Sequence, residues 1–160
     1  MKKFELTAEF VTNVFGKKLF RIKALVAFGD VEKGELGGFI EKEGNLSHDG
    51  NAWVSGNARV SGDAWVSGNA QVSGDARVYG NADFSVVEGF GRYFRATTFF
   101  RCKDKILRVQ CGCFYGDLAQ FREIVKETHG DSKYAKEYLA IADLMELHFS
   151  DEEEKQEVAE

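Results

Sequence analysis

Small apolar residues recur every six positions through the middle of the chain. In each unit an alanine is followed two residues later by a valine or phenylalanine, and the residue between them is polar, charged or tryptophan. Alternate residues of a strand point to the same face, so both apolar residues turn inward. This period is typical of a β-helix, a stack of very short strands. The valine positions are Val54, Val60, Val66, Val72, Val78 and Phe84, and each alanine lies two residues earlier.

Glycine opens each of eight consecutive hexapeptides between Gly38 and Ser85. Glycine and the Asn or Asp that often follows it tolerate the left-handed backbone conformation, which suits the corners of a coil. Three straight pieces and three corners close a triangular coil of about 18 residues, so the repeat predicts about 2.7 coils. In the second hexapeptide this register puts Leu46 at the alanine position and His48 at the valine position. We expect such atypical units near an end of the stack.

The residue between each alanine and valine points outward, and positions one coil apart stack on the same wall. In this register Glu41 lies beneath Arg59 as a surface ion pair. Trp53 and Trp65 also point outward, and exposed apolar side chains of this size indicate a contact. We therefore expect a homo-oligomer or partner interface at the two tryptophans. The alternative is that other parts of the same chain cover one of them.

The flanks of the repeat predict two further units. Alternating apolar and polar residues at 4–7 and 19–25 are typical of half-buried strands. Segments 95–102 and 106–113 predict a hairpin, followed by two helices. The fold class is therefore mainly β with an α+β C-terminus. The predicted domains are an N-terminal β cap (1–37), a short parallel β-helix (38–87), a ββαα module (88–150) and an acidic disordered tail (151–160).

A tight turn in the hairpin would place Phe100 and Cys102 on one face with Val109, and Phe99 and Arg101 on the opposite face. The helices are expected to cover the first of these faces.

Capping residues mark the ends of the two helices. Asp117 with Gln120 three residues later forms a capping box. Gly130 ends the first helix, and Asp131 or Ser132 caps the second.

The net charge of −5 belongs to the end of the chain. The last ten residues hold six acidic side chains and one lysine, whereas the other 150 residues carry 20 basic and 20 acidic side chains. This predicts a solvated tail, and direct DNA binding is not expected.

The sequence shows no signal peptide and no membrane span, and its cysteine count is odd, which favours a reducing cytoplasm.

The candidate chemistry is sparse. Cys102, Cys111, Cys113 and His129 could together supply zinc ligands, but they lack paired C-x₂-C knuckles, so metal binding stays open and no cofactor is expected. The chain has no phosphate-binding loop and no Ser-His-Asp spacing. His48, the only histidine of the repeat, points inward. We expect a protein that is not an enzyme and has no catalytic residues.

A basic segment with interleaved aromatic residues follows the repeat, at residues 92–108. Arginines beside aromatic rings suit phosphate binding, base stacking or an acidic protein patch. The alternative is a solvated hairpin face whose aromatic residues belong to the core. The candidate binding residues are Arg92, Arg95, Phe99, Arg101, Lys103 and Arg108.

Two stretches resemble a known group of proteins. FRIKALVAFGDVEKGELGGFIEKEGNLSHDGNAWVSGNARVSG and TTFFRCKDKILRVQCGCFYGDLAQFREIVKETHGDSKYAKEYL are similar to small hexapeptide-repeat proteins of phages and prophages. The left-handed turn of the β-helix is taken from this resemblance. Acyltransferases resemble the chain in the repeat only.

The resemblance implies a non-catalytic phage interaction protein. The sharper expectation is an inhibitor of bacterial antiphage immunity, which binds a host defence protein or sequesters a signalling nucleotide. The alternatives are a structural or assembly oligomer and a degenerate hexapeptide acyltransferase.

Overall fold

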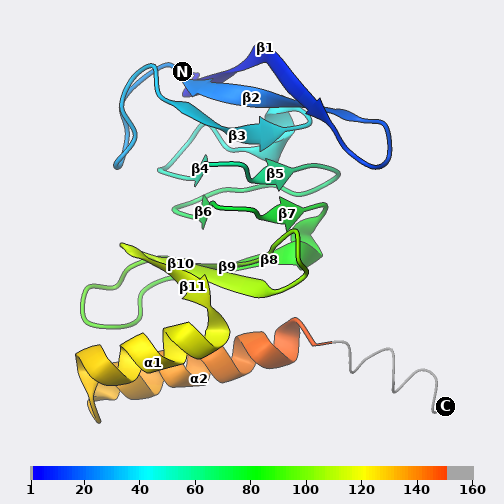
Figure 1. Ribbon diagram of the computed structural model, residues 1–160. Helices are drawn as coiled ribbons and strands as arrows, with labels where there is room; N and C mark the ends of the chain where they lie inside the picture. Colours follow the sequence, from blue (N-terminus) through cyan, green and yellow to red (C-terminus); the bar gives the residue numbers. More distant parts are fainter. Residues whose placement is uncertain (1, 151–160) are drawn as a thin grey trace, which may run out of the picture.

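The computed structural model describes residues 2–150, and the predicted acidic tail of residues 151–160 lies outside them. Stacked short strands fill the middle of the molecule, between an N-terminal hairpin and two C-terminal helices (Figure 1). The strands are β1 (Phe4–Thr12), β2 (Lys18–Ala24), β3 (Leu36–Ile40), β4 (Trp53–Val54), β5 (Arg59–Val60), β6 (Gln71–Val72), β7 (Arg77–Val78), β8 (Phe84–Val87), β9 (Thr97–Arg101), β10 (Leu107–Cys111) and β11 (Phe114–Asp117), and the helices are α1 (Leu118–His129) and α2 (Lys133–His148).

The N-terminal strands extend one wall of the stack. β1 and β2 pair antiparallel, β2 pairs antiparallel with β3, and β3, β5 and β7 pair in parallel. The result is an open, mixed sheet in the order β1-β2-β3-β5-β7. A register shift in β1 lies between Leu6 and Phe10.

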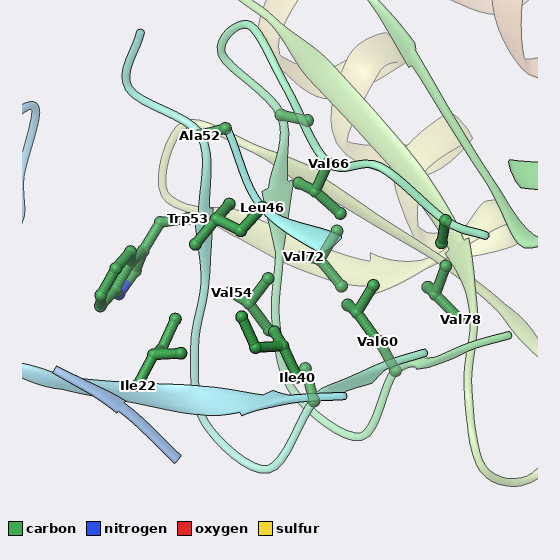
Figure 2. Close-up of a cluster of buried hydrophobic side chains, with 14 of the residues drawn as sticks. Ile22, Ile40, Leu46, Ala52, Trp53, Val54, Val60, Val66, Val72 and Val78 are labelled. Carbon is green, nitrogen blue, oxygen red and sulfur yellow. The ribbon is translucent and has the colours of Figure 1, made fainter. Parts of the chain in front are cut away.

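The later coils follow the expected register. Trp53 pairs with Gln71, and Arg59 pairs with Arg77, in both cases one regular coil apart. Their inward valines form one buried cluster with the alanines, and Figure 2 shows these valines pointing to a shared interior. The spacing of small apolar residues therefore predicted the solenoid core correctly.

The first coil differs from the expectation. Ile40 pairs with Val60, and Leu46 forms a bridge with Val66, so both residues occupy valine positions. Two extra residues are therefore accommodated in the corner after Leu46, and His48 does not point into the core as expected. Its half-buried ring stacks on Phe4 with the ring centroids 4.2 Å apart.

This shift also corrects the outward walls. Arg59 pairs with Phe39, not with Glu41. The Glu41 carboxylate instead lies 3.5 Å from Lys17 Nζ, and its Oε1 accepts a hydrogen bond from the Gly62 N–H at 2.9 Å. The expected pair between Glu41 and Arg59 is wrong, because the insertion moves Glu41 away from the middle of that wall.

The C-terminal module contains a four-stranded antiparallel sheet in the order β11-β10-β9-β8, and not the expected two-stranded hairpin. Arg101 pairs with Leu107 and Phe99 pairs with Val109, a register one residue away from the predicted one. A shift of one residue exchanges the two faces of a strand. Phe100 therefore packs in the solenoid core, and Phe99 packs in the core beneath the helices.

The predicted helix ends are confirmed. Asp117 accepts a hydrogen bond from the Gln120 N–H, and the Gln120 side chain bonds back to the Asp117 N–H. Gly130 ends α1 with φ +58°, and Ser132 caps α2. Within residues 2–150, neither helix has the length and apolar character to cross a membrane.

Candidate functional site

The structure divides the predicted basic segment among three places. Arg101 lies between the solenoid and the end of α2, where its Nη2 donates to the Phe149 carbonyl at 3.1 Å. Its Nε lies 3.5 Å from Asp83, and its guanidinium carbon lies 5.3 Å from the centroid of the Phe149 ring. Through these contacts Arg101 connects the end of the solenoid, at Asp83, with the residue that follows α2, Phe149.

Arg108 and Lys103 lie at a second place, a polar cavity of about 310 Å³. Arg108 donates to both carboxylate oxygens of Asp104, at 3.0 and 3.2 Å. This pairing, together with the N–H of Ile106, lowers the pKa of the Asp104 carboxyl group. Asp75 also lines the cavity. The positive charges of Lys103 and Arg108 are therefore balanced there by the carboxylates of Asp75 and Asp104.

Phe99 does not belong to any exposed surface. Its side chain is 0% exposed and packs edge-on against Phe121, with the ring centroids 6.0 Å apart. The sequence expectation placed Phe99 outward because it assumed the wrong hairpin register. We therefore remove Phe99 from the candidate binding surface.

Arg92 and Arg95 lie at the third place, the rim of an apolar pocket of about 290 Å³. Both side chains are exposed, and their guanidinium carbons lie 5.9 and 5.2 Å from the centroid of the Tyr93 ring. Neither arginine forms an ion pair with a carboxylate within residues 2–150. Gly112 has φ +57° and no side chain, which leaves room for the Arg95 guanidinium group.

Aromatic and aliphatic side chains from β11, α1 and α2 line the interior of this pocket. Phe121 and Val125 lie on the buried face of α1, and Tyr138 comes from the buried face of α2. Burial, followed by the nearby Cys111, raises the pKa of Tyr138 to about 12. The Tyr138 hydroxyl lies against Gly91, where a larger residue would strike it.

The four candidate metal ligands do not converge. Cys111, Cys113 and His129 line the pocket, but Cys102 lies on the opposite side of the sheet, with its Sγ 3.9 Å from the Tyr115 hydroxyl. Burial raises the pKa of the Cys102 thiol. Within the described residues, no group of three or more His, Cys, Asp or Glu side chains is placed to hold a metal ion.

The two tryptophans have different surroundings. Trp53 is only 2% exposed, and the ring of Phe28 packs edge-on against it at 5.3 Å. Figure 2 shows Trp53 beside the valine cluster, near Ile22. The N-terminal region therefore covers Trp53, as the alternative expectation held, whereas Trp65 is 56% exposed.

Sequence reasoning missed the interior of the Arg92 pocket. Phe121, Val125 and Tyr138 were not among the candidate binding residues. The sequence did contain a signal for this pocket. Tyr138 in α2 and His129 at the end of α1 place polar atoms on helix faces whose other residues are apolar. Their rings stack at 5.8 Å and form one side of the pocket.

The stacked short strands define the chain as a β-solenoid repeat protein with two C-terminal helices. The family described as YdcK Beta solenoid repeat matches residues 50–68 and 70–82. This match covers most of the regular coils and none of the C-terminal module. A comparison with curated proteins finds no match.

Proposed function

We propose that the chain is a non-catalytic binding protein of phage or prophage origin that inhibits bacterial antiphage immunity. In this proposal the C-terminal module sequesters a signalling nucleotide in the pocket beside Arg92 and Arg95. The observation that carries the proposal is a pair of arginines, without carboxylate partners in residues 2–150, at the rim of an apolar pocket.

The chemistry of the pocket favours a ligand with a flat ring and a negative charge. A guanidinium group binds phosphate through two parallel hydrogen bonds, and its attraction is strongest where water is excluded. Tyr93, Phe114 and Phe121 offer aromatic surface for a base. A volume of about 290 Å³ is close to the lower limit for small-molecule pockets, which suits one nucleotide unit better than a protein surface.

Sequestration needs affinity without a chemical step. Burial raises the pKa of Tyr138 to about 12, further from neutral pH than the ordinary value for tyrosine, which disfavours its use as a base. The Cys111 thiol accepts a hydrogen bond from Thr97 Oγ1 at 3.3 Å, so it is held in place within the sheet. Within residues 2–150 the geometry shows no nucleophile paired with a base, and His129 stacks on Tyr138 in the pocket wall, which supports binding rather than catalysis. We therefore propose a protein that is not an enzyme.

The finer description of the fold is part of the same proposal. We assign the coils as left-handed hexapeptide repeats, about 2.7 in number, with an N-terminal β cap. The regular spacing of paired residues in β4 to β7 supports this assignment. We further propose that the protein acts in the cytoplasm of the bacterial host.

Calorimetric titration of the full chain tests the proposal with three probes: cyclic di-AMP, AMP and adenosine. Cyclic di-AMP and AMP should bind. Adenosine should bind far more weakly, because it has no phosphate group to accept hydrogen bonds from the two arginines. The double variant Arg92→Ala/Arg95→Ala should bind the phosphates about 100-fold more weakly, as expected for two lost charged hydrogen bonds. Lys105→Ala removes an exposed cation outside the pocket and should bind like the wild type.

Two results would count against this function. The first is a double variant that retains wild-type affinity. The second is a double variant that loses binding but still protects phage from host immunity in a plating assay. The second result would separate nucleotide binding from inhibition.

A structural or assembly oligomer is the second candidate, and the exposure of Trp65 favours it. Sedimentation at micromolar concentration distinguishes the two functions. Large polymers that Trp65→Glu abolishes would support assembly, whereas a discrete species would support the binding protein. A degenerate acyltransferase receives no comparable support, because the His48 ring already contacts the Lys3 N–H and Glu43.

A further inference from the structure

A polar groove of about 630 Å³ runs along the solenoid wall that carries Gln71. Asn51 and Asn69 lie on the same wall, at corresponding positions of successive coils. Asp30, in the loop between β2 and β3, lines the groove, and so does Glu88, in the loop after β8. The groove adjoins the Arg92 pocket, but its lining includes four side-chain amides and two carboxylates.

Hydrogen bonds fix the orientation of the side chains that line this groove. Asn69 Nδ2 donates to Glu88 Oε2 at 3.0 Å, and Gln71 Nε2 donates to the Asn51 carbonyl at 2.9 Å. Gln110 accepts from Ser73 Oγ and donates to the Gly112 carbonyl, both at 2.8 Å. An amide has two donor hydrogens and two acceptor lone pairs, so each of these side chains keeps unused capacity.

Phe94 supplies an independent observation. It is 68% exposed, lines the groove and has φ +57°, a conformation that bulky residues rarely adopt. Such backbone strain is concentrated at binding sites. Tyr93, the preceding residue, lines the apolar pocket, so the strained backbone directs two adjacent rings to two different sites.

We propose that this groove binds an uncharged, polyhydroxylated ring, that is, a saccharide. Each hydroxyl group both donates and accepts, which matches paired amides and carboxylates such as Asn69 and Glu88. The exposed ring of Phe94 offers a flat apolar surface for the C–H face of a sugar. Asp30 and Glu88 outnumber Arg95, so the groove disfavours anions. This ligand class goes beyond the proposed function, whose pocket takes a negative charge.

Nuclear magnetic resonance titration of the full chain tests the inference. The probes are galactose, N-acetylglucosamine and maltotriose, each at up to about 20 mM, within the range of weak millimolar affinity. At least one probe should cause saturable shifts at the backbone amides of Asn51, Asn69, Gln71 and Glu88. Tetrahydropyran, a ring without hydroxyl groups, should cause none. The inference is overturned if no sugar shifts these amides, or if tetrahydropyran shifts them equally.

Variants of two nearby phenylalanines separate a binding role from a structural role. Phe94→Asn should weaken sugar binding about tenfold and leave the thermal midpoint unchanged or higher, because asparagine tolerates the left-handed conformation. Phe90→Asn removes an exposed ring that does not line the groove and should bind like the wild type. Wild-type sugar affinity in Phe94→Asn, or a clear loss of stability, would contradict the inference. Its affinity for AMP should not change, which keeps this test separate from the proposed function.

Discussion

In the regular coils of the solenoid, alanine and valine fill the interior at fixed positions, whereas the C-terminal module buries large side chains from one strand and two helices. Val60 and Val78 lie at equivalent places of successive coils, and so do Val54 and Val72. Phe99 from β9, Phe121 from α1 and Tyr138 from α2 pack against one another without any repeat. A repeated core leaves little freedom to shape a cavity, and the apolar pocket lies in the module that does not repeat.

The two regions also handle charge differently. On the solenoid wall Arg77 donates to backbone carbonyls of Asn57, Asp75 and Ala76, which ties it to the coils. In the module Arg92 and Arg95 stand at the pocket rim without such bonds among the described residues. The difference supports the proposed nucleotide site in the module, where the two arginines keep their donors free for a ligand.

The largest expected effect tests the two cores against each other. Phe99→Ala should lower the free energy of unfolding by about 3–5 kcal/mol, because it opens a large cavity in the module. Val72→Ala should cost about 2 kcal/mol, the value of two buried methyl groups. Chemical denaturation measures both. Equal costs would mean that the two cores do not differ as described.

A pair of glycine variants tests how tightly the coils stack. Gly62 and Gly68 share φ +64°, but a Cβ at Gly62 would overlap the carbonyl oxygen of Tyr79 on the next coil, and a Cβ at Gly68 meets open space. Gly68→Ala should cost about 1–2 kcal/mol from backbone strain alone. Gly62→Ala should cost about 3 kcal/mol or more. If the two variants have similar midpoints in urea denaturation, the close approach of Gly62 to the Tyr79 carbonyl is contradicted.

Lys3 gives the solenoid end a pH dependence. Burial lowers the pKa of its amine to about 8, although Nζ donates to the Ala52 carbonyl at 2.7 Å. The unfolded chain keeps this proton up to about pH 10.5, so it binds more protons than the folded chain between pH 8 and 10.5. Stability should therefore rise across this window, by on the order of 2 kcal/mol.

Two variants isolate the contribution of Lys3. Lys3→Met should remove the rise, because no amine then titrates at that position. Lys105→Met, at an exposed turn, should keep it. Thermal unfolding at a series of pH values gives both curves. If stability still rises between pH 8 and 10.5 in Lys3→Met, another titratable group causes the rise.

The smallest expected effect lies at the start of α1. Asp117→Ala should cost about 1 kcal/mol, because it removes one side of the capping box. The more conservative Asp117→Asn should cost less, since it keeps an oxygen that can accept the Gln120 N–H. Thermal denaturation measures both. A loss of stability above about 2 kcal/mol would mean that Asp117 contributes more to the stability of the module than a helix cap alone provides.

The sequence was sufficient for features set by local chemistry. The helix caps at Asp117 and Ser132 depend on side chains a few residues away, and the solenoid core depends on a short period. The insertion after Leu46 was missed because glycine continues at six-residue spacing while the inward positions move by two. The size of Leu46 was the available signal, since it fits a valine position better than an alanine position.

The candidate site depended on contacts that the pattern could not fix. The turn after Arg101 closes with a Cys102 N–H to Ile106 carbonyl bond and a positive φ at Lys105, and this set a register one residue from the expected one. This difference of one residue in the pairing of β9 with β10 places Phe99 in the core beneath the helices. The pocket beside Arg92 also needs α1 and α2 to pack against β10 and β11, an arrangement far from local in sequence.

The bulge in β1, between Leu6 and Phe10, has a consequence for growth of the stack. β1 is the outer strand of its sheet, and an open outer strand can recruit a strand from another molecule. A bulge interrupts the row of free backbone groups and twists the strand, which discourages such pairing. At the opposite end, the sheet of β8 to β11 and the two helices cover the last coil (Figure 1). We therefore expect both ends of the solenoid to resist fibre formation by added coils.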